Sequence, residues 1–208
     1  MAFTNTETKE IHCKVIYFGC EHSGKTANLR SIFNSTSAEI QSGLLELHDD
    51  SGTTSYFDFL PLSMGQFKSF HLKVHLFTLP LNSLYLFTLP LNSLFVTIPT
   101  VILKGVDGFV FVADSRIECL ADNANHLSKC KKLLLDNGYS AGQIPKVIQY
   151  NKRDMPGIMP VEILRQELNP GGAPDFESVA IKGIGVIETL EGLAKLMTDK
   201  LENSTHLQ

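Results

Sequence analysis

A glycine-framed stretch near the amino terminus has the residue types and spacing of a phosphate-binding loop. Residues 19–26 read G-C-E-H-S-G-K-T, which satisfies the pattern G-x-x-x-x-G-K-[ST]. Glycines at both ends let the backbone wrap around a polyphosphate, so that its N–H groups and a helix N-terminus face the negative oxygens. Lys25 is expected to reach the β- and γ-phosphates, and the Thr26 hydroxyl to ligate Mg²⁺.

A second motif, N-K-x-D, occupies residues 151–154 and follows the apolar stretch 146–150. A carboxylate can accept the two neighbouring N–H donors of guanine, which adenine does not present, so Asp154 is expected to select guanine. Asn151 is expected to tie the base loop to the phosphate loop, and the stem of Lys152 to lie over the purine face. Alone, this tetrapeptide usually marks a solvated turn, but its place after a phosphate loop favours base recognition.

Alternating strands and helices are needed to position the two motifs. Apolar runs predict strands at 11–18, 55–61, 70–79, 107–113, 145–151 and 177–180, and helices at 25–35, 118–136, 160–168 and 188–202. Strands separated by helices indicate parallel crossovers with a ligand at the carboxyl ends of the strands, where both motifs fall. Strands 55–61 and 70–79 are predicted to form an antiparallel hairpin that turns at residues 63–66.

The bulk properties fit one globular domain. The chain has 208 residues, with 43% hydrophobic and 19% charged residues, which is enough to bury a core without disulfides. A net charge of −4 argues against nucleic acid as a partner. The four cysteines show no C-x-x-C spacing, and the N-terminus has no basic region followed by an apolar stretch, so a cytoplasmic location is expected.

Four stretches together resemble the bacterial Ras-like small GTPases of the MglA gliding-motility family. They are residues 25–29 (K-T-A-N-L), 57–62 (F-D-F-L-P-L), 105–115 (G-V-D-G-F-V-F-V-A-D-S) and 147–154 (V-I-Q-Y-N-K-R-D). The resemblance implies a single α/β domain over residues 1–208, a Ras-like P-loop fold with a mostly parallel six-stranded sheet and helices on both faces. It also implies GTP or GDP with Mg²⁺ as cofactors.

The resemblance adds site residues to those that the motifs supply. Thr54 matches the switch I residue that closes on Mg²⁺ and the γ-phosphate, so Thr26 and Thr54 are the expected metal ligands. Ala180 lies in the loop behind the base and is expected to offer its N–H to the guanine carbonyl, whereas Lys182 either lines the ribose or faces water. The expected nucleotide-binding set is Gly19, Glu21, His22, Ser23, Gly24, Lys25, Thr26, Ala27, Thr54, Asn151, Lys152, Asp154, Ala180 and Ile181.

Three positions depart from the family pattern where hydrolysis is concerned. Asn82 stands at the position of the water-orienting glutamine and is one methylene shorter, so no residue is assigned as catalytic. Thr53 replaces an arginine whose role is worth roughly 10³ to 10⁵ in rate. Glu21 replaces a glycine and would repel the γ-phosphate, although His22 would offset this in part if protonated. These departures predict that nucleotide binding is kept while hydrolysis is weak or absent.

A tandem repeat interrupts the chain. The nine residues 76–84 recur unchanged at 86–94, which indicates a ten-residue duplication in the switch II region. The alternation through residues 69–76 favours the first copy as the strand, although the second leads directly into residues 95–103. Residues 74–103 carry no charge, yet prolines at 80, 90 and 99 argue against an integral membrane span. The repeat either widens a partner-binding face or is packed.

Two functions remain open at this point. The first is a polarity switch that binds GTP and recruits effectors at a cell pole. The second is a pseudo-GTPase scaffold that binds polarity or motility partners independently of a nucleotide cycle. The family resemblance implies a roadblock-fold activating protein and a response-regulator-type polarity scaffold as partners, and a monomer is expected.

Overall fold

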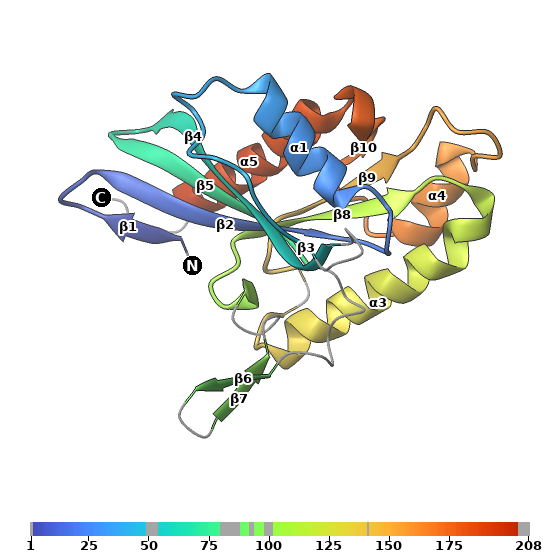
Figure 1. The fold of residues 1–208 in the computed structure, drawn as a ribbon, viewed down its shortest axis with the longest axis horizontal. Helices are drawn as coiled ribbons and strands as arrows, with labels where there is room; N and C mark the ends of the chain where they lie inside the picture. The colour runs from blue at the N-terminus through green and yellow to red at the C-terminus, as the bar shows by residue number, and fades with distance from the viewer. Residues whose placement is uncertain are drawn as a thin grey trace.

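The fold is seen in a computed structural model of the chain (Figure 1). It describes residues 2–48, 54–79, 88–91, 94–97, 102–140 and 142–203, with the backbone alone at 47–48, 54–57, 88–91 and 94–97.

One mixed sheet forms the centre of the domain. Its strands are β1 (Phe3–Asn5), β2 (Glu10–Phe18), β3 (Leu45–His48), β4 (Thr54–Phe67), β5 (Phe70–Thr78), β8 (Gly108–Asp114), β9 (Lys146–Asn151) and β10 (Asp175–Glu177). The order is β10-β9-β8-β2-β5-β4-β3, and β1 also pairs with β2. The pairs among β10, β9, β8, β2 and β5 are parallel, whereas β1, β3 and β4 pair antiparallel.

The predicted fold class is confirmed, but the predicted count of six strands is wrong because the sheet has eight. The two strands that the sequence did not predict, β1 and β3, span three and four residues. Both are antiparallel additions whose place in the sheet comes from pairing with a longer neighbour. Such short edge strands carry too little alternation to stand out in a sequence.

In the part of the chain that the structure describes, four helices of eight or more residues cover the two faces of the sheet (Figure 1). They are α1 (Lys25–Ser35), α3 (Leu120–Asp136), α4 (Val161–Leu168) and α5 (Val186–Asn203), close to the predicted ranges. Helices α1 and α5 pack on one face and α3 and α4 on the other. The alternation of β2 explains the two cores, since Val15 and Tyr17 face the first and Ile16 and Phe18 the second.

The β4–β5 hairpin turns later than predicted. The turn falls at residues 68–69, where Lys68 has a φ of 54°, and residues 63–66 belong to β4. The register between β4 and β5 shifts between Ser63 and Gln66. Gly65, with a φ of 79°, lies in this irregular segment, so its conformational freedom serves a bulge within the strand and not the hairpin turn.

The two copies of the repeat have different structures. In the first copy, residues 76–78 complete β5 and pair with both β2 and β4, and Leu79 is buried beyond the strand. In the second copy, β6 (Thr88–Leu91) pairs with β7 (Leu94–Thr97) in a separate two-stranded sheet. Figure 1 shows this hairpin projecting from the body of the domain. The first copy therefore supplies the core strand, as the sequence favoured.

Deleting residues 80–89 is expected to leave a folded domain, because the two copies are identical and the deletion restores one intact copy after Val74. Loop-closure entropy changes slowly with length, so the free energy of unfolding should change by less than about 1 kcal/mol. Chemical denaturation measures it. Leu76→Asp, which places a charge in the buried first copy, is the destabilised control. Loss of cooperative unfolding in the deletion variant would show that the second copy belongs to the core.

Candidate functional site

The two motifs meet at the carboxyl edge of the parallel sheet. The phosphate loop follows β2, the N-K-R-D segment begins with the last residue of β9, and β8 lies between these strands with Asp114 at its end. A fourth segment, residues 178–182, follows β10 and ends in a short 3₁₀ turn. Carboxyl ends of neighbouring parallel strands share one edge, so side chains distant in the sequence are brought together here.

The backbone of the phosphate loop requires its two glycines. Gly19 and Gly24 have φ values of 145° and 105°, which residues with a Cβ rarely adopt. A Cβ on Gly19 would lie 2.2 Å from the carbonyl oxygen of Val112, and one on Gly24 would lie 2.1 Å from Nδ2 of Asn151. Close approach to β8 and β9 therefore fixes the curve of the loop, which leads directly into α1 at Lys25.

Lys25 lies inside this loop with only 9% of its surface exposed. Its ammonium donates to the carbonyl oxygens of Gly19, at 3.1 Å, and Cys20, at 2.7 Å. Burial lowers the pKa of Lys25 to about 8, because the charged form loses its hydration. An anion held in the loop would favour the charged ammonium again, so the site is matched to a negatively charged ligand.

Asp58 on β4 is a candidate site residue to which the sequence reasoning gave no role. One carboxylate oxygen, Oδ2, accepts hydrogen bonds from the hydroxyls of Thr26, at 2.6 Å, and Thr78, at 2.9 Å. Asp58 is fully buried, and no donor among the described residues reaches its Oδ1. The signal in the sequence was an acidic residue in phase with Leu60 and Leu62, which face the core.

Asn151 joins three segments of the site. Its Nδ2 donates to the carbonyl oxygen of Ser23 at 2.7 Å, which is the predicted tie between base loop and phosphate loop. Its Oδ1 accepts from the Ser178 hydroxyl at 3.1 Å and from the Ala180 N–H at 2.9 Å. The Ala180 N–H, which the resemblance offered to a guanine carbonyl, is thus bonded to Asn151 in this structure.

Asp114 is a second buried carboxylate without a role in the sequence reasoning. It bonds the Arg116 guanidinium, at 2.8 Å for the closest pair, and the Lys152 ammonium at 2.7 Å. Burial alone would raise its pKa, but these hydrogen bonds outweigh burial and lower the pKa of Asp114 to about 2. The ammonium of Lys152, whose backbone has a φ of 64°, is therefore anchored to the end of β8.

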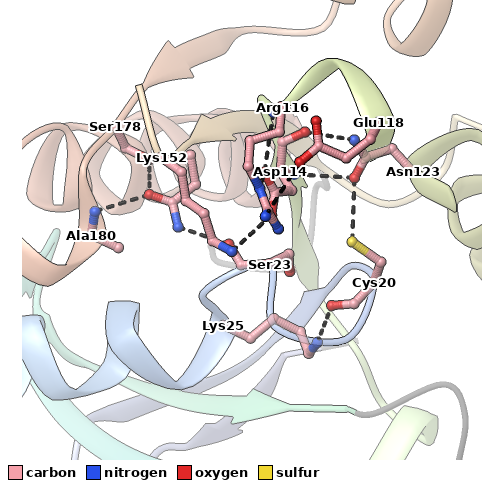
Figure 2. Close-up of polar contacts among 11 residues, drawn as sticks. Cys20, Ser23, Lys25, Asp114, Arg116, Glu118, Asn123, Lys152, Ser178 and Ala180 are labelled. Carbon is pink, nitrogen blue, oxygen red and sulfur yellow. Dashed lines mark hydrogen bonds and ion pairs between the residues drawn. The ribbon is translucent and has the colours of Figure 1, made fainter. Parts of the chain in front are cut away.

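Helix α3 is tied to the same group of residues. The side chain of Asn123 accepts from the Asp114 N–H and donates to the Asp114 carbonyl, at 3.1 and 2.8 Å. The same amide oxygen accepts the Cys20 thiol at 3.4 Å, as Figure 2 shows. Burial raises the pKa of the Cys20 thiol above its usual value, which keeps it protonated as a donor. Asn123 thereby connects the phosphate loop to β8.

The other predicted residues divide between the loop surface and the base side. Glu21 and His22 are exposed at the tip of the phosphate loop, with 3.8 Å between their side chains. Ser23 is buried, Ala27 is half-buried on α1, and Ile181 is exposed. Asp154 pairs with Lys182. The backbone of Thr54 begins β4, but its side chain, and all of Thr53 and Asn82, lie outside the described residues.

Comparison with known proteins gives one relative along nearly the whole chain. The chain is 42% identical over 202 residues to the mutual gliding-motility protein MglA of Myxococcus xanthus (strain DK1622), which covers 97% of this chain and 98% of that protein. No family model matches. In the part of the chain that the structure describes, no helix is both long and apolar enough to cross a membrane.

Asn151→Ala is expected to lower the free energy of unfolding by about 3 kcal/mol, because it leaves three buried groups on Ser23, Ser178 and Ala180 without their partner. Asn125→Ala, at an exposed position of α3, is the matched control and should change stability by less than about 0.5 kcal/mol. Urea denaturation measures both. A loss no larger than that of the control would show that the three segments do not depend on this junction.

Proposed function

Since the chain belongs to the MglA family of bacterial small GTPases, we propose that it binds GTP and GDP and acts as a polarity switch that recruits effectors at a cell pole. The observation that supports this most directly is the Asn151 junction, which holds the phosphate loop and the base loop at one edge of the sheet. A nucleotide that spans both loops would contact Lys25 at its phosphates and Asp154 at its base.

The phosphate side of the site has the properties that a polyphosphate needs. The loop amides and the first turn of α1 provide a positive concave surface. Lys25 lies against that surface with a pKa lowered to about 8, so binding of phosphate oxygens and recovery of its full charge favour each other. The predicted base residues Asn151, Lys152 and Asp154 lie at and just after the end of β9, two strands away from β2.

The residues present also fit Mg²⁺. The fit rests on the fully buried Asp58 carboxylate, whose Oδ1 has no donor among the described residues, beside the hydroxyl of Thr26. A carboxylate and a hydroxyl are oxygen ligands of the kind that Mg²⁺ takes, directly or through water. Thr26 and Thr54 would hold the ion beside the phosphates and Asp58 would orient Thr26. Bound Mg²⁺ neutralises phosphate charge there.

Hydrolysis is proposed to be weak or absent. Glu21 lies at the tip of the phosphate loop, where a carboxylate would face the terminal phosphate and raise the energy of the charged transition state. Asn82 and Thr53 stand where the resemblance implies glutamine and arginine. A roadblock-fold activating protein would then have few groups to organise, and a response-regulator-type scaffold would meet a long-lived GTP form.

A pseudo-GTPase scaffold is the second candidate, and one observation favours it. The Lys25 ammonium has two carbonyl partners inside the loop, and Asn151 closes the loop against β9. A loop whose polar groups are paired with protein groups is held in shape by those contacts. Partners would then bind a surface that does not depend on a nucleotide cycle.

The binding proposal predicts that GDP with Mg²⁺ binds while ADP does not, because the Asp154 carboxylate is complementary to guanine. Isothermal titration calorimetry measures both affinities. Lys25→Ala and Asp154→Ala should each abolish GDP binding, and Lys195→Ala, an exposed position on α5, should leave it unchanged. GDP affinity should be higher with Mg²⁺ than with EDTA, and Asp58→Asn should reduce this difference. Equal affinity for ADP would overturn the guanine assignment, and no nucleotide binding would favour the scaffold.

The hydrolysis proposal predicts slow phosphate release. Under single-turnover conditions, GTP turnover should stay low with or without a roadblock-fold activator, because the positions of the arginine and the glutamine hold other residues. Glu21→Gly combined with Asn82→Gln should raise the rate by at least about tenfold, since the first change removes a repelling charge and the second lengthens a side chain. A fast wild-type burst would show that another residue carries the reaction.

A further inference from the structure

A buried polar network connects the phosphate loop to α5 and has no role in what precedes. Its three side chains, Asn28 on α1, Gln149 on β9 and Thr189 on α5, are fully buried. The amides of Asn28 and Gln149 bond each other twice, at 2.8 and 2.9 Å. Gln149 also donates to the Thr189 hydroxyl at 3.0 Å, and this hydroxyl donates to the carbonyl of Gly185. Asn28 also donates to the carbonyl of Gly24 at 3.0 Å, so the network ends at the phosphate loop.

Stability alone does not account for amide side chains at these buried positions. All four side-chain N–H groups of Asn28 and Gln149 have acceptors, so the pair avoids the cost of an unpaired buried donor. Replacing both partners of such a pair by apolar side chains of similar shape is close to neutral. The contact of Asn28 with the Gly24 carbonyl is the one that an apolar pair could not reproduce.

The Gly24 carbonyl sets the direction of the amide that follows it. The peptide bond between Gly24 and Lys25 is trans, and in a trans peptide the C=O and the N–H point in opposite directions. The carbonyl accepts from both the backbone N–H and the side chain of Asn28, each at 3.0 Å, so it points along α1. The Lys25 N–H therefore points out of the start of α1, where no acceptor among the described residues reaches it.

We propose that Asn28 is a positioning residue for phosphate binding and that Gln149 holds its amide in place. By fixing the Gly24 carbonyl, Asn28 keeps the Lys25 N–H directed out of the loop. An unpaired amide at a helix N-terminus is a donor for phosphate oxygens, and a fixed direction lets it bind them without reorganising the loop. Asn28 itself touches no ligand in this arrangement, because it acts from behind the loop.

The neighbouring peptide of the loop is held in the same way by a different residue. Asn151 donates to the Ser23 carbonyl at 2.7 Å, which directs the Gly24 N–H away from Asn151. The Gly24 N–H is thus an internal reference. It should respond to a change at Asn151 and not to a change at Asn28.

This inference rests on the proposed nucleotide binding, and the experiment separates the two. Asn28→Leu combined with Gln149→Met removes both amides and retains similar shapes. The urea midpoint of the nucleotide-free protein should stay close to that of the wild type, because both partners are removed together. GDP affinity, measured by isothermal titration calorimetry, should fall about fivefold, the effect of one neutral hydrogen bond. In ¹⁵N–¹H spectra at saturating GDP, the Lys25 amide proton should move upfield while that of Gly24 keeps its position.

Thr189→Val is the matched control. It removes a hydroxyl from the same network but leaves the paired amides and the contact of Asn28 with Gly24. It should lower the urea midpoint, because a buried N–H of Gln149 loses its acceptor, and leave GDP affinity and the Lys25 resonance close to those of the wild type.

Each other outcome has a distinct meaning. If Thr189→Val weakens GDP binding as much as the double variant does, affinity follows the stability of the core and the proposal is wrong. It is also wrong if the double variant keeps wild-type affinity, or if the Lys25 and Gly24 resonances move together. Should the double variant not fold, Asn28→Ala alone allows the same comparison of the two resonances. If the wild-type protein does not bind GDP, the nucleotide-binding function fails first and this inference falls with it.

Discussion

The Asn151 side chain is the interaction on which the geometry of the site depends. It lies at the end of β9 and holds the phosphate loop through Ser23 and the loop after β10 through Ser178 and Ala180. The contact is so close that only glycine fits at position 24, where a Cβ would meet the Asn151 amide. A change at one of these loops therefore has to be accommodated by the others, because none of them can move without leaving a buried polar group unpaired.

Two buried carboxylates complete this arrangement, and they differ in the groups that they bind. Asp114 binds the cations of Arg116 and Lys152, so its burial is offset by two charged partners. Asp58 binds hydroxyls on Thr26 and Thr78, which compensate a buried charge less completely. This difference explains why Asp58 is the better candidate for an ion-binding role. A divalent cation near Thr26 would lie beside Asp58, which has no ion pair among the described residues, whereas Asp114 already has two.

Binding and hydrolysis place different demands on the same loops. Binding relies on groups that the fold holds in place, such as the buried Lys25 and the Asn151 junction. The family resemblance assigns hydrolysis to side chains of the switch segments, and the proposed departures from that pattern are Asn82 and Thr53 there and Glu21 in the phosphate loop. The duplication is likewise divided between the core and its surroundings. Its first copy is part of β5, and its second copy forms a hairpin outside the main sheet. A chain of this kind can lose turnover without losing its core.

The sequence alone determined the fold class and the approximate positions of the principal elements, because strand and helix periodicity, the phosphate-loop pattern and N-K-x-D are local signals. It also determined that Asn151 would join the two loops. It missed β1 and β3, whose few residues become strands only through pairing, and it placed the β4–β5 turn at residues 63–66, where the structure has a bulge within β4. Local patterns cannot distinguish a positive φ in a turn from one in a bulge.

Tertiary structure decided which polar groups meet. Asp58 approaches Thr26 because β4 lies beside β5 and near the start of α1, and Asp114 reaches Lys152 because β8 and β9 are neighbours. Neither pair can be recognised from a local sequence pattern, because its two members are more than thirty residues apart in the chain. The same holds for Lys182, whose two sequence interpretations were the ribose and the solvent, and which the structure places on Asp154. Distances between side chains arise from packing of the whole sheet, whereas the sequence records only the order of its strands.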